Sequence, residues 1–231
     1  MRKGTSATLK NNQSSTPITA SEVMRLLQRE YGPFVWEPRL DAVSELVYTV
    51  LSQHTSDINS ERAFRKLLET FGSLEAVADA DVQKIAASIS SGGLSRIKAP
   101  RIKRILNHIK RERESLNIDF LKDLPLTEAK EWLKKLPGIG PKSAAVILCF
   151  SLGMPAMPVD THIYRVSKRL GFIGLKTSVN DAHDVLEKMV TPKNVFPFHL
   201  LLINHGRKVC KAQRPQCNKC ILAERCPSRI I

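Results

Sequence analysis

Apolar residues recur at helical spacing along most of this chain, and this periodicity is the strongest constraint on its fold. Leu46, Val50 and Leu51, for example, fall on one face of a helix. No segment alternates apolar and polar residues convincingly, as a half-buried strand does. The sequence therefore predicts an all-α protein of about ten helices with short loops. The clearest helical stretches are 23–31, 40–51, 64–71, 97–109 and 196–206.

Several polar residues stand where their short side chains can accept from the free N–H groups of a first helical turn. Pro141 suits the first position of a further helix, which we expect to end near Leu152. Gly171 is expected to end the helix that precedes it. The expected caps are Ser73, Asp81, Thr127, Asp160 and Asn180.

The net charge of +14 over 231 residues is unevenly distributed. Residues 96–113 carry eight basic side chains and one acid, and residues 205–231 carry seven and one. A near-neutral body with two basic patches favours a polyanionic partner, and nucleic acid is the leading choice. A merely solubilising surface is the alternative.

Residues 1–16 are polar and small, and we expect them to be disordered because they can bury nothing. The longest apolar run, 144–154, is only half a membrane crossing. The N-terminus lacks the apolar stretch of a secretory signal. We therefore expect a protein of the prokaryotic cytoplasm, associated with the nucleoid and not with a membrane.

The segment Leu-Pro-Gly-Ile-Gly-Pro-Lys at 136–142 separates two apolar helical stretches. Gly138 and Gly140, with Ile139 between them, permit a tight turn and a close approach of the backbone to a ligand. The helix that follows presents free N–H groups and a positive dipole end, which together form a phosphate cradle. The segment predicts a helix-hairpin-helix that grips the DNA backbone without reading its sequence. An ordinary turn between packed helices is the alternative.

Lys142 and Asp160 each stand at the start of a helix, joined by a short, proline-braced loop. The dipole end and partial burial would both favour a neutral Lys142 amine, a nucleophile suited to Schiff-base chemistry. Asp160 could take its proton and then stabilise positive charge on a sugar. The alternatives are a phosphate contact for Lys142 and a simple helix cap for Asp160.

Four of the five cysteines fall within the last 22 residues, with the spacing Cys-x6-Cys-x2-Cys-x5-Cys. Four thiolates this close can surround one metal centre. Zinc sites also use the Cys-x2-Cys element, but only one such pair is present, which modestly favours an iron–sulfur cluster. Lys211, Arg214 and Lys219 lie between the ligands and suit a phosphate clamp, unless they are merely solvated. The four cysteines are Cys210, Cys217, Cys220 and Cys226.

Together these motifs resemble those of the endonuclease III family of DNA glycosylases, in the helix-hairpin-helix superfamily, over about residues 18–228. The resemblance rests on the 136–142 segment, on Val-Asp-Thr-His-Ile-Tyr-Arg at 159–165, on His-Gly-Arg at 205–207 and on the cysteine spacing. It implies that the four cysteines hold a [4Fe–4S] cluster. It also implies that Lys142 and Asp160 occupy the family's catalytic positions.

The resemblance implies an all-α fold of two domains with the active cleft between them. A six-helix barrel domain, which contains the hairpin, would span 36–154. A cluster domain would combine 17–35 with 155–231.

The resemblance also implies a mechanism. A damaged nucleotide is flipped out of double-stranded DNA into the cleft. Asp160 activates Lys142, whose amine displaces the base at C1′. The Schiff base then undergoes β-elimination, which nicks the strand. The expected enzyme is thus a monomeric DNA glycosylase and abasic-site lyase, and its substrates are oxidised pyrimidines such as thymine glycol and abasic sites.

The segment at 51–57 resembles the part of the family that fills the gap left by the flipped base. The family usually has glutamine at the position of His54, whereas this chain has Gln53 just before it. Leu94 falls where the family often inserts a second side chain. These three residues are expected DNA contacts. A neutral, hydrogen-bonded helix histidine is the alternative for His54.

Two other functions stay open on the sequence. One is a mismatch glycosylase that removes thymine or adenine without lyase chemistry. The other is a non-catalytic DNA-binding or redox-sensing module that uses only the hairpin and the cluster.

Overall fold

The computed structural model describes residues 17–230. Every regular element in this range is helical, which confirms the all-α prediction. The expected disordered tail at 1–16 lies outside the described residues. The α-helices are α1 (Ala20–Tyr31), α2 (Ala42–Ser52), α3 (Asp57–Phe71), α4 (Leu74–Asp79), α5 (Val82–Ser88), α6 (Ser95–Arg113), α7 (Leu126–Lys134), α8 (Pro141–Phe150), α9 (Thr161–Arg169), α10 (Val179–Glu187) and α11 (Val195–Lys208). Short 3-10 turns lie at Ser90–Gly92, Asp119–Asp123, Pro192–Asn194, Cys217–Lys219 and Ala223–Arg225.

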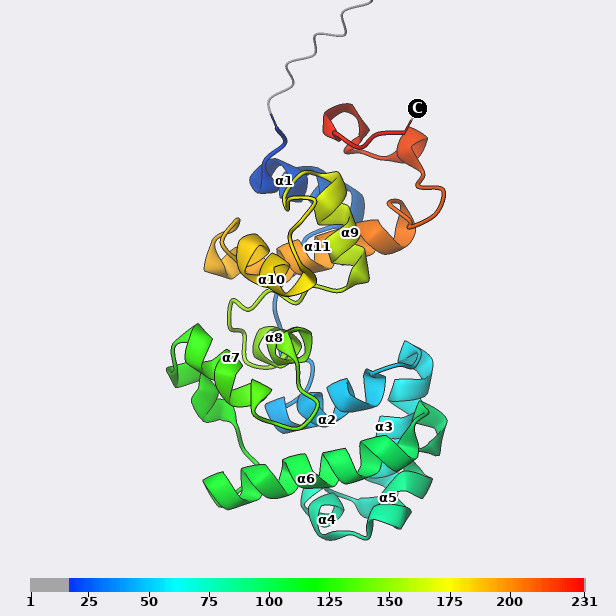
Figure 1. Ribbon diagram of the computed structural model, residues 1–231, viewed down its shortest axis with the longest axis vertical. Helices are drawn as coiled ribbons and strands as arrows, with labels where there is room; N and C mark the ends of the chain where they lie inside the picture. Colours follow the sequence, from blue (N-terminus) through cyan, green and yellow to red (C-terminus); the bar gives the residue numbers. More distant parts are fainter. Residues whose placement is uncertain (1–16, 231) are drawn as a thin grey trace, which may run out of the picture.

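The helices form two groups, each around its own apolar core (Figure 1). The first core takes its buried side chains from 42–156 and so includes α2 to α8. The second core takes them from 18–27 and 157–222, so that α1 packs with α9, α10, α11 and the C-terminal segment. The chain passes between the cores twice, first between Leu27 and Ala42 and again between Ala156 and Met157, after α8 has ended.

Helix starts follow local capping chemistry. Thr127 does not cap α7, because the helix begins one residue before it, directly after the extended Pro125. Asn180 does not cap α10, because the Ser178 hydroxyl accepts from the Asp181 N–H (3.1 Å) and starts the helix earlier. Those two predictions are wrong. The other three predicted caps accept first-turn N–H groups and are confirmed: Ser73, Asp81 and Asp160.

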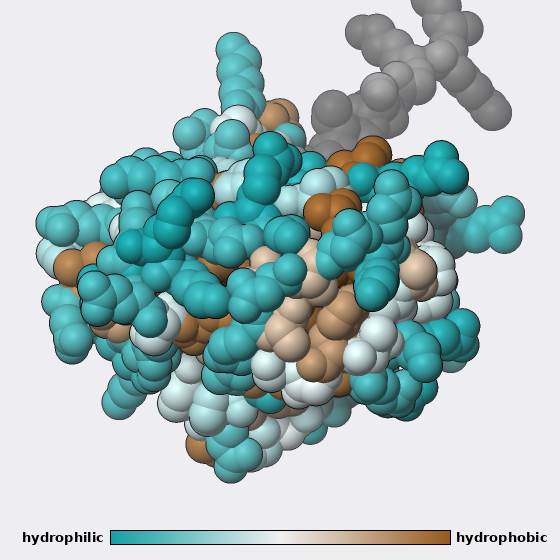
Figure 2. Space-filling view, turned by 90° about the horizontal axis from the view of Figure 1, so that it is seen from below, coloured by the Kyte–Doolittle hydropathy of each residue, from teal (hydrophilic) through white to brown (hydrophobic). Residues whose placement is uncertain are grey.

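The basic stretch at 96–113 forms α6, whose apolar side chains face the first core as its periodicity predicts. Figure 2 views the end of the molecule that bears α4, α5 and α6, and its surface is mostly hydrophilic. Within residues 17–230, no helix has both the length and the apolar character needed to span a membrane.

Candidate active site

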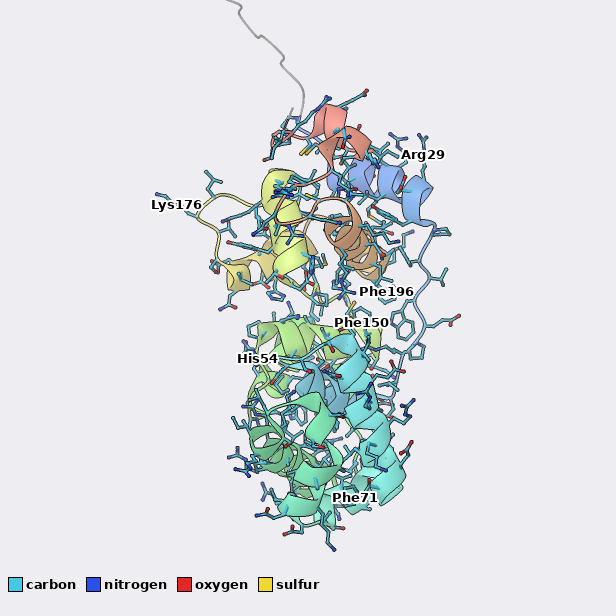
Figure 3. The ribbon with its side chains drawn as sticks, turned by 90° about the vertical axis from the view of Figure 1, so that its right-hand side faces the viewer. Arg29, His54, Phe71, Phe150, Lys176 and Phe196 are labelled. Carbon is cyan, nitrogen blue, oxygen red and sulfur yellow. The ribbon has the colours of Figure 1, made fainter. Side chains whose placement is uncertain are left out.

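A cleft of about 690 Å³ lies where the two groups of helices meet. Residues from α2, α8 and α11 line it, together with the loops that precede α3 and α9. Figure 3 shows His54, Phe150 and Phe196 close to where the two groups of helices meet, whereas Arg29 and Phe71 lie toward opposite ends of the molecule. The cleft thus draws on both cores, and α8, whose buried side chains belong to the first core, also contacts α10 and α11 of the second group.

The turn between α7 and α8 has the helix-hairpin-helix geometry that the sequence predicts. Gly138 has φ +77°, a left-handed conformation that favours glycine, and the Arg101 guanidinium packs against it so closely that an added Cβ would lie 2.5 Å from Nε. Gly140 is the extended N-cap residue of α8, and Pro141 takes the first helical position. The N–H groups of this first turn are therefore free to bind an anion.

Lys142 and Asp160 both line the cleft. Lys142 is the second residue of α8 and is exposed, so the expected partial burial is wrong. Asp160 caps α9 by accepting the Ile163 N–H on Oδ1 (2.7 Å), as its alternative reading proposes. Its second oxygen, Oδ2, has no hydrogen-bond partner in the described part of the chain, and neither has the Lys142 amine. The cap therefore leaves half of the carboxylate available for chemistry.

His199 lines the same cleft and was missed by the sequence reasoning. It is 5% exposed, and its Nδ1 lies 3.0 Å from the Pro158 carbonyl, which selects the tautomer that donates there. Burial lowers the pKa of His199 to about 4, so it is neutral at pH 7. A neutral histidine in this place anchors the backbone just before Asp160. Its position on the apolar face of α11 gave no signal that set it apart from a core residue.

Arg39 and Glu45 are a second pair on the cleft side that the sequence reasoning missed. Glu45 is 0% exposed and forms a bidentate ion pair with Arg39, which lines the cleft. The signal was Glu45, the one acid inside the apolar helix α2 after its cap Asp41, because a buried carboxylate requires a partner. The partner itself precedes the helix, and periodicity does not locate it.

The expected gap-filling residues lie on two neighbouring loops. His54 follows the end of α2, is exposed and makes no hydrogen bond within the described residues, so the reading as a hydrogen-bonded helix histidine is wrong. Leu94 is 50% exposed and directly precedes α6. Both have left-handed backbones, with φ of 55° and 52°, a conformation that costs a non-glycine residue about 1–2 kcal/mol. Strain of this kind concentrates at functional loops.

Gln53 turns toward the hairpin. Its Nε2 donates to the Gly138 carbonyl (3.0 Å), and its Oε1 accepts from Arg101 Nη1 (2.8 Å). The Gln53 side chain therefore joins the loop after α2 to the hairpin. The side chain of its neighbour His54 is exposed and makes no hydrogen bond within the described residues.

Lys98 joins the loops that carry His54 and Leu94. It is 2% exposed, and its ammonium group donates to the Leu51 carbonyl (2.7 Å) and to the Gly92 carbonyl (2.8 Å). Leu51 is three residues before His54, and Gly92 is two residues before Leu94. One buried cation thus sets the spacing of both loops.

The four C-terminal cysteines line one cavity beside the second core. Arg169 Nη1 donates to Cys210 Sγ (3.3 Å) and to the Lys211 carbonyl (2.7 Å), which fixes the loop that follows α11. Lys211, Arg214 and Lys219 are exposed on this loop. Within residues 17–230, no three His, Cys, Asp or Glu side chains are arranged to hold one single metal ion.

Comparison with known proteins gives concordant matches. Residues 47–192 match the model of the family described as "HhH-GPD superfamily base excision DNA repair protein". The endonuclease III of Sulfolobus acidocaldarius is 30% identical over 208 residues, 89% of this chain and 91% of that protein. The endonuclease III of Thermotoga maritima is 33% identical over 186 residues, 80% of this chain and 83% of that protein.

Among solved structures, a non-covalent endonuclease III–DNA complex superposes with a TM-score of 0.76 and 28% identity, covering 91% of this chain and 96% of that one. A trapped endonuclease III–DNA covalent intermediate gives 0.74 and 27%, covering 91% and 97%. The predicted all-α helix-hairpin-helix glycosylase fold and the predicted enzyme class are therefore confirmed. The chain is an enzyme of base excision repair, a DNA glycosylase that belongs to the HhH-GPD superfamily and, within it, to the endonuclease III family.

Proposed function

We propose that this enzyme removes oxidised pyrimidines such as thymine glycol from double-stranded DNA, and cleaves abasic sites, through a Schiff base on Lys142. One observation carries the proposal. Lys142 and Asp160 line the same cleft, and neither the amine nor the carboxylate Oδ2 is engaged by another described group.

The catalytic steps follow from these two side chains. A flipped nucleotide enters the cleft, and Asp160 accepts a proton from the Lys142 ammonium. The amine then attacks C1′ and displaces the base, which leaves with the electron pair of the glycosidic bond. The C1′–O4′ bond then breaks and opens the sugar ring, which gives the Schiff base between Lys142 and C1′. Loss of a C2′ proton from this Schiff base expels the 3′ phosphate by β-elimination, which breaks the strand on the 3′ side of the lesion.

The DNA contacts proposed are of two kinds. The hairpin at Gly138–Ile139–Gly140 and the first turn of α8 would hold phosphates through backbone N–H groups. His54 and Leu94 would enter the gap in the duplex, since both are exposed and lie on strained loops that Lys98 joins. Gln53 would act through the hairpin that it already contacts.

We infer that the four cysteines hold a [4Fe–4S] cluster. The four cysteines line one cavity beside the second core, and four thiolates around one space are the donor set of an iron–sulfur cluster. When bound, the cluster would cross-link the C-terminal segment and add folding free energy. Lys211 and Arg214 would then be held at the surface as phosphate contacts.

We also propose two domains: a barrel domain at 36–154, and a cluster domain made of 17–35 with 155–231. The division into two cores supports this proposal, although the first core extends to Ala156, two residues beyond the proposed boundary. The active cleft lies at their junction. A monomeric state and a prokaryotic, nucleoid-associated location stay predictions.

Borohydride trapping tests the mechanism on two duplexes, one with thymine glycol and one with an abasic site. Wild type should form a covalent adduct on both, and Lys142→Gln should form none. Lys66→Gln, at an exposed position of α3 that does not line the cleft, is the matched control and should behave as wild type. An adduct and normal nicking by Lys142→Gln would refute the mechanism. Trapping on the abasic duplex alone, with release of mismatched thymine, would keep the mechanism and replace the substrate class.

A further inference from the structure

Arg39 is held rigidly on the wall of the cleft. It lies in the loop between α1 and α2, where its backbone N–H donates to the Phe150 carbonyl (3.3 Å). Its Nε and Nη2 both donate to the Glu45 carboxylate, the former at 2.9 Å. The Thr49 hydroxyl also donates to that carboxylate (3.4 Å). A fully buried acid therefore fixes one edge of the guanidinium.

Two aromatic rings fix the plane of the same guanidinium. Its Cζ lies 4.9 Å from the centre of the Tyr48 ring and 5.3 Å from that of Phe150. Phe150 and Phe196 lie side by side (Figure 3), and Phe196 contacts the Phe150 ring edge-on at 5.3 Å between ring centres. His199 contacts the same ring edge-on, also at 5.3 Å. These contacts tie Arg39 to both cores, and a planar cation between rings is a favourable arrangement.

The other edge of the guanidinium has no protein partner. A guanidinium has five N–H donors and no acceptor, and Glu45 takes Nε–H and one N–H of Nη2. Nη1 has no partner among residues 17–230. The side chain is half-exposed and shares the cleft with Lys142 and Asp160. Arg39 thus brings unused donors to the wall of the cleft that also holds Lys142 and Asp160.

We infer that Arg39 reads the flipped base by donating hydrogen bonds to its carbonyl oxygens, and so favours keto bases over amino bases. The inference rests on the proposed function and adds a specificity residue to it. A donor-only group matches the O4 edge of an oxidised uracil or thymine, but it repels the amino group that replaces O4 in cytosine derivatives. Glu45 sets the angle of the guanidinium and is a positioning residue.

The test compares two lesions that differ only at this edge, 5-hydroxyuracil and 5-hydroxycytosine, in single-turnover release by the cluster-loaded full-length enzyme. Wild type should release 5-hydroxyuracil about tenfold faster, the factor expected from one hydrogen bond to a charged group. Arg39→Lys keeps the charge for Glu45 but loses the planar fork, and it should reduce the preference to about one. Arg65→Lys, at an exposed ion pair on α3, is the control and should keep the preference.

Removing Arg39 alone could unfold the protein by leaving Glu45 buried and unpaired. The double variant Arg39→Gln with Glu45→Gln removes both charges and is the second test, with the same loss of preference expected. Cleavage of an abasic duplex, which has no base to read, runs in parallel. Arg39→Lys should slow abasic-site cleavage by a factor at least ten times smaller than the factor by which it slows 5-hydroxyuracil release. Equal losses on both substrates, or an unchanged preference, would overturn the inference, whereas wild type inactive on the abasic duplex would overturn the proposed function instead.

Discussion

Lys98 should contribute more to the free energy of unfolding than an exposed lysine does. The variant Lys98→Met measures this contribution. Methionine fills a similar volume without a donor. The change leaves the Leu51 and Gly92 carbonyls buried without their donor, and each unsatisfied group costs about 1–3 kcal/mol. Burial also lowers the pKa of Lys98, so removing a buried ammonium recovers part of the loss. The expected net loss is about 2–4 kcal/mol of unfolding free energy.

Lys103→Met is the matched control, because Lys103 lies on the same helix and donates to one carbonyl, that of Ala80 (2.6 Å), at a partly exposed site. Water can replace that donor, so its loss should stay below about 1 kcal/mol. Urea unfolding of the cluster-loaded proteins measures both. Hydrogen–deuterium exchange should also rise over 51–57 and 90–97 in Lys98→Met alone. Equal destabilisation by the two variants, or unchanged exchange in both loops, would refute the reasoning.

Two further predictions concern pH and the cluster. The pKa of His199 is lowered to about 4 in the folded chain, while the unfolded chain takes up a proton near 6.5. The free energy of unfolding therefore falls as the pH drops from about 6.5 toward 4, and His199 accounts for up to about 3 kcal/mol of this loss. Urea unfolding between about pH 8 and pH 5 should show that wild type loses stability relative to His199→Gln; a pH-independent difference would contradict this. Cys217→Ser should lose the brown colour and the solubility of the folded protein together, and a colourless protein of full stability by thermal unfolding would argue against a structural cluster.

Features that depend on neighbouring residues could be predicted from the sequence alone. The helical periodicity of 40–51 and the caps at Ser73 and Asp81 depend on side chains within one turn. The hairpin at 136–142 depends on glycine conformations that no partner needs to impose. The predicted caps Thr127 and Asn180 were wrong because each helix begins one residue before the predicted cap, after Pro125 and Ser178 respectively. Even these errors stay within two residues.

Contacts across the fold were decided by the tertiary structure. Lys98 reaches carbonyls 47 and 6 residues away, and nothing in a basic amphipathic stretch distinguishes it from its solvated neighbours. Arg39 lies against Tyr48 and Phe150 only because α8 packs against α2. Phe196 and His199 of α11 then contact Phe150 and hold its ring in place. The sequence determined which residues could do the chemistry, since their type and local spacing are written there. Their exposure, partners and orientation depend on long-range packing, and only the folded chain determines these.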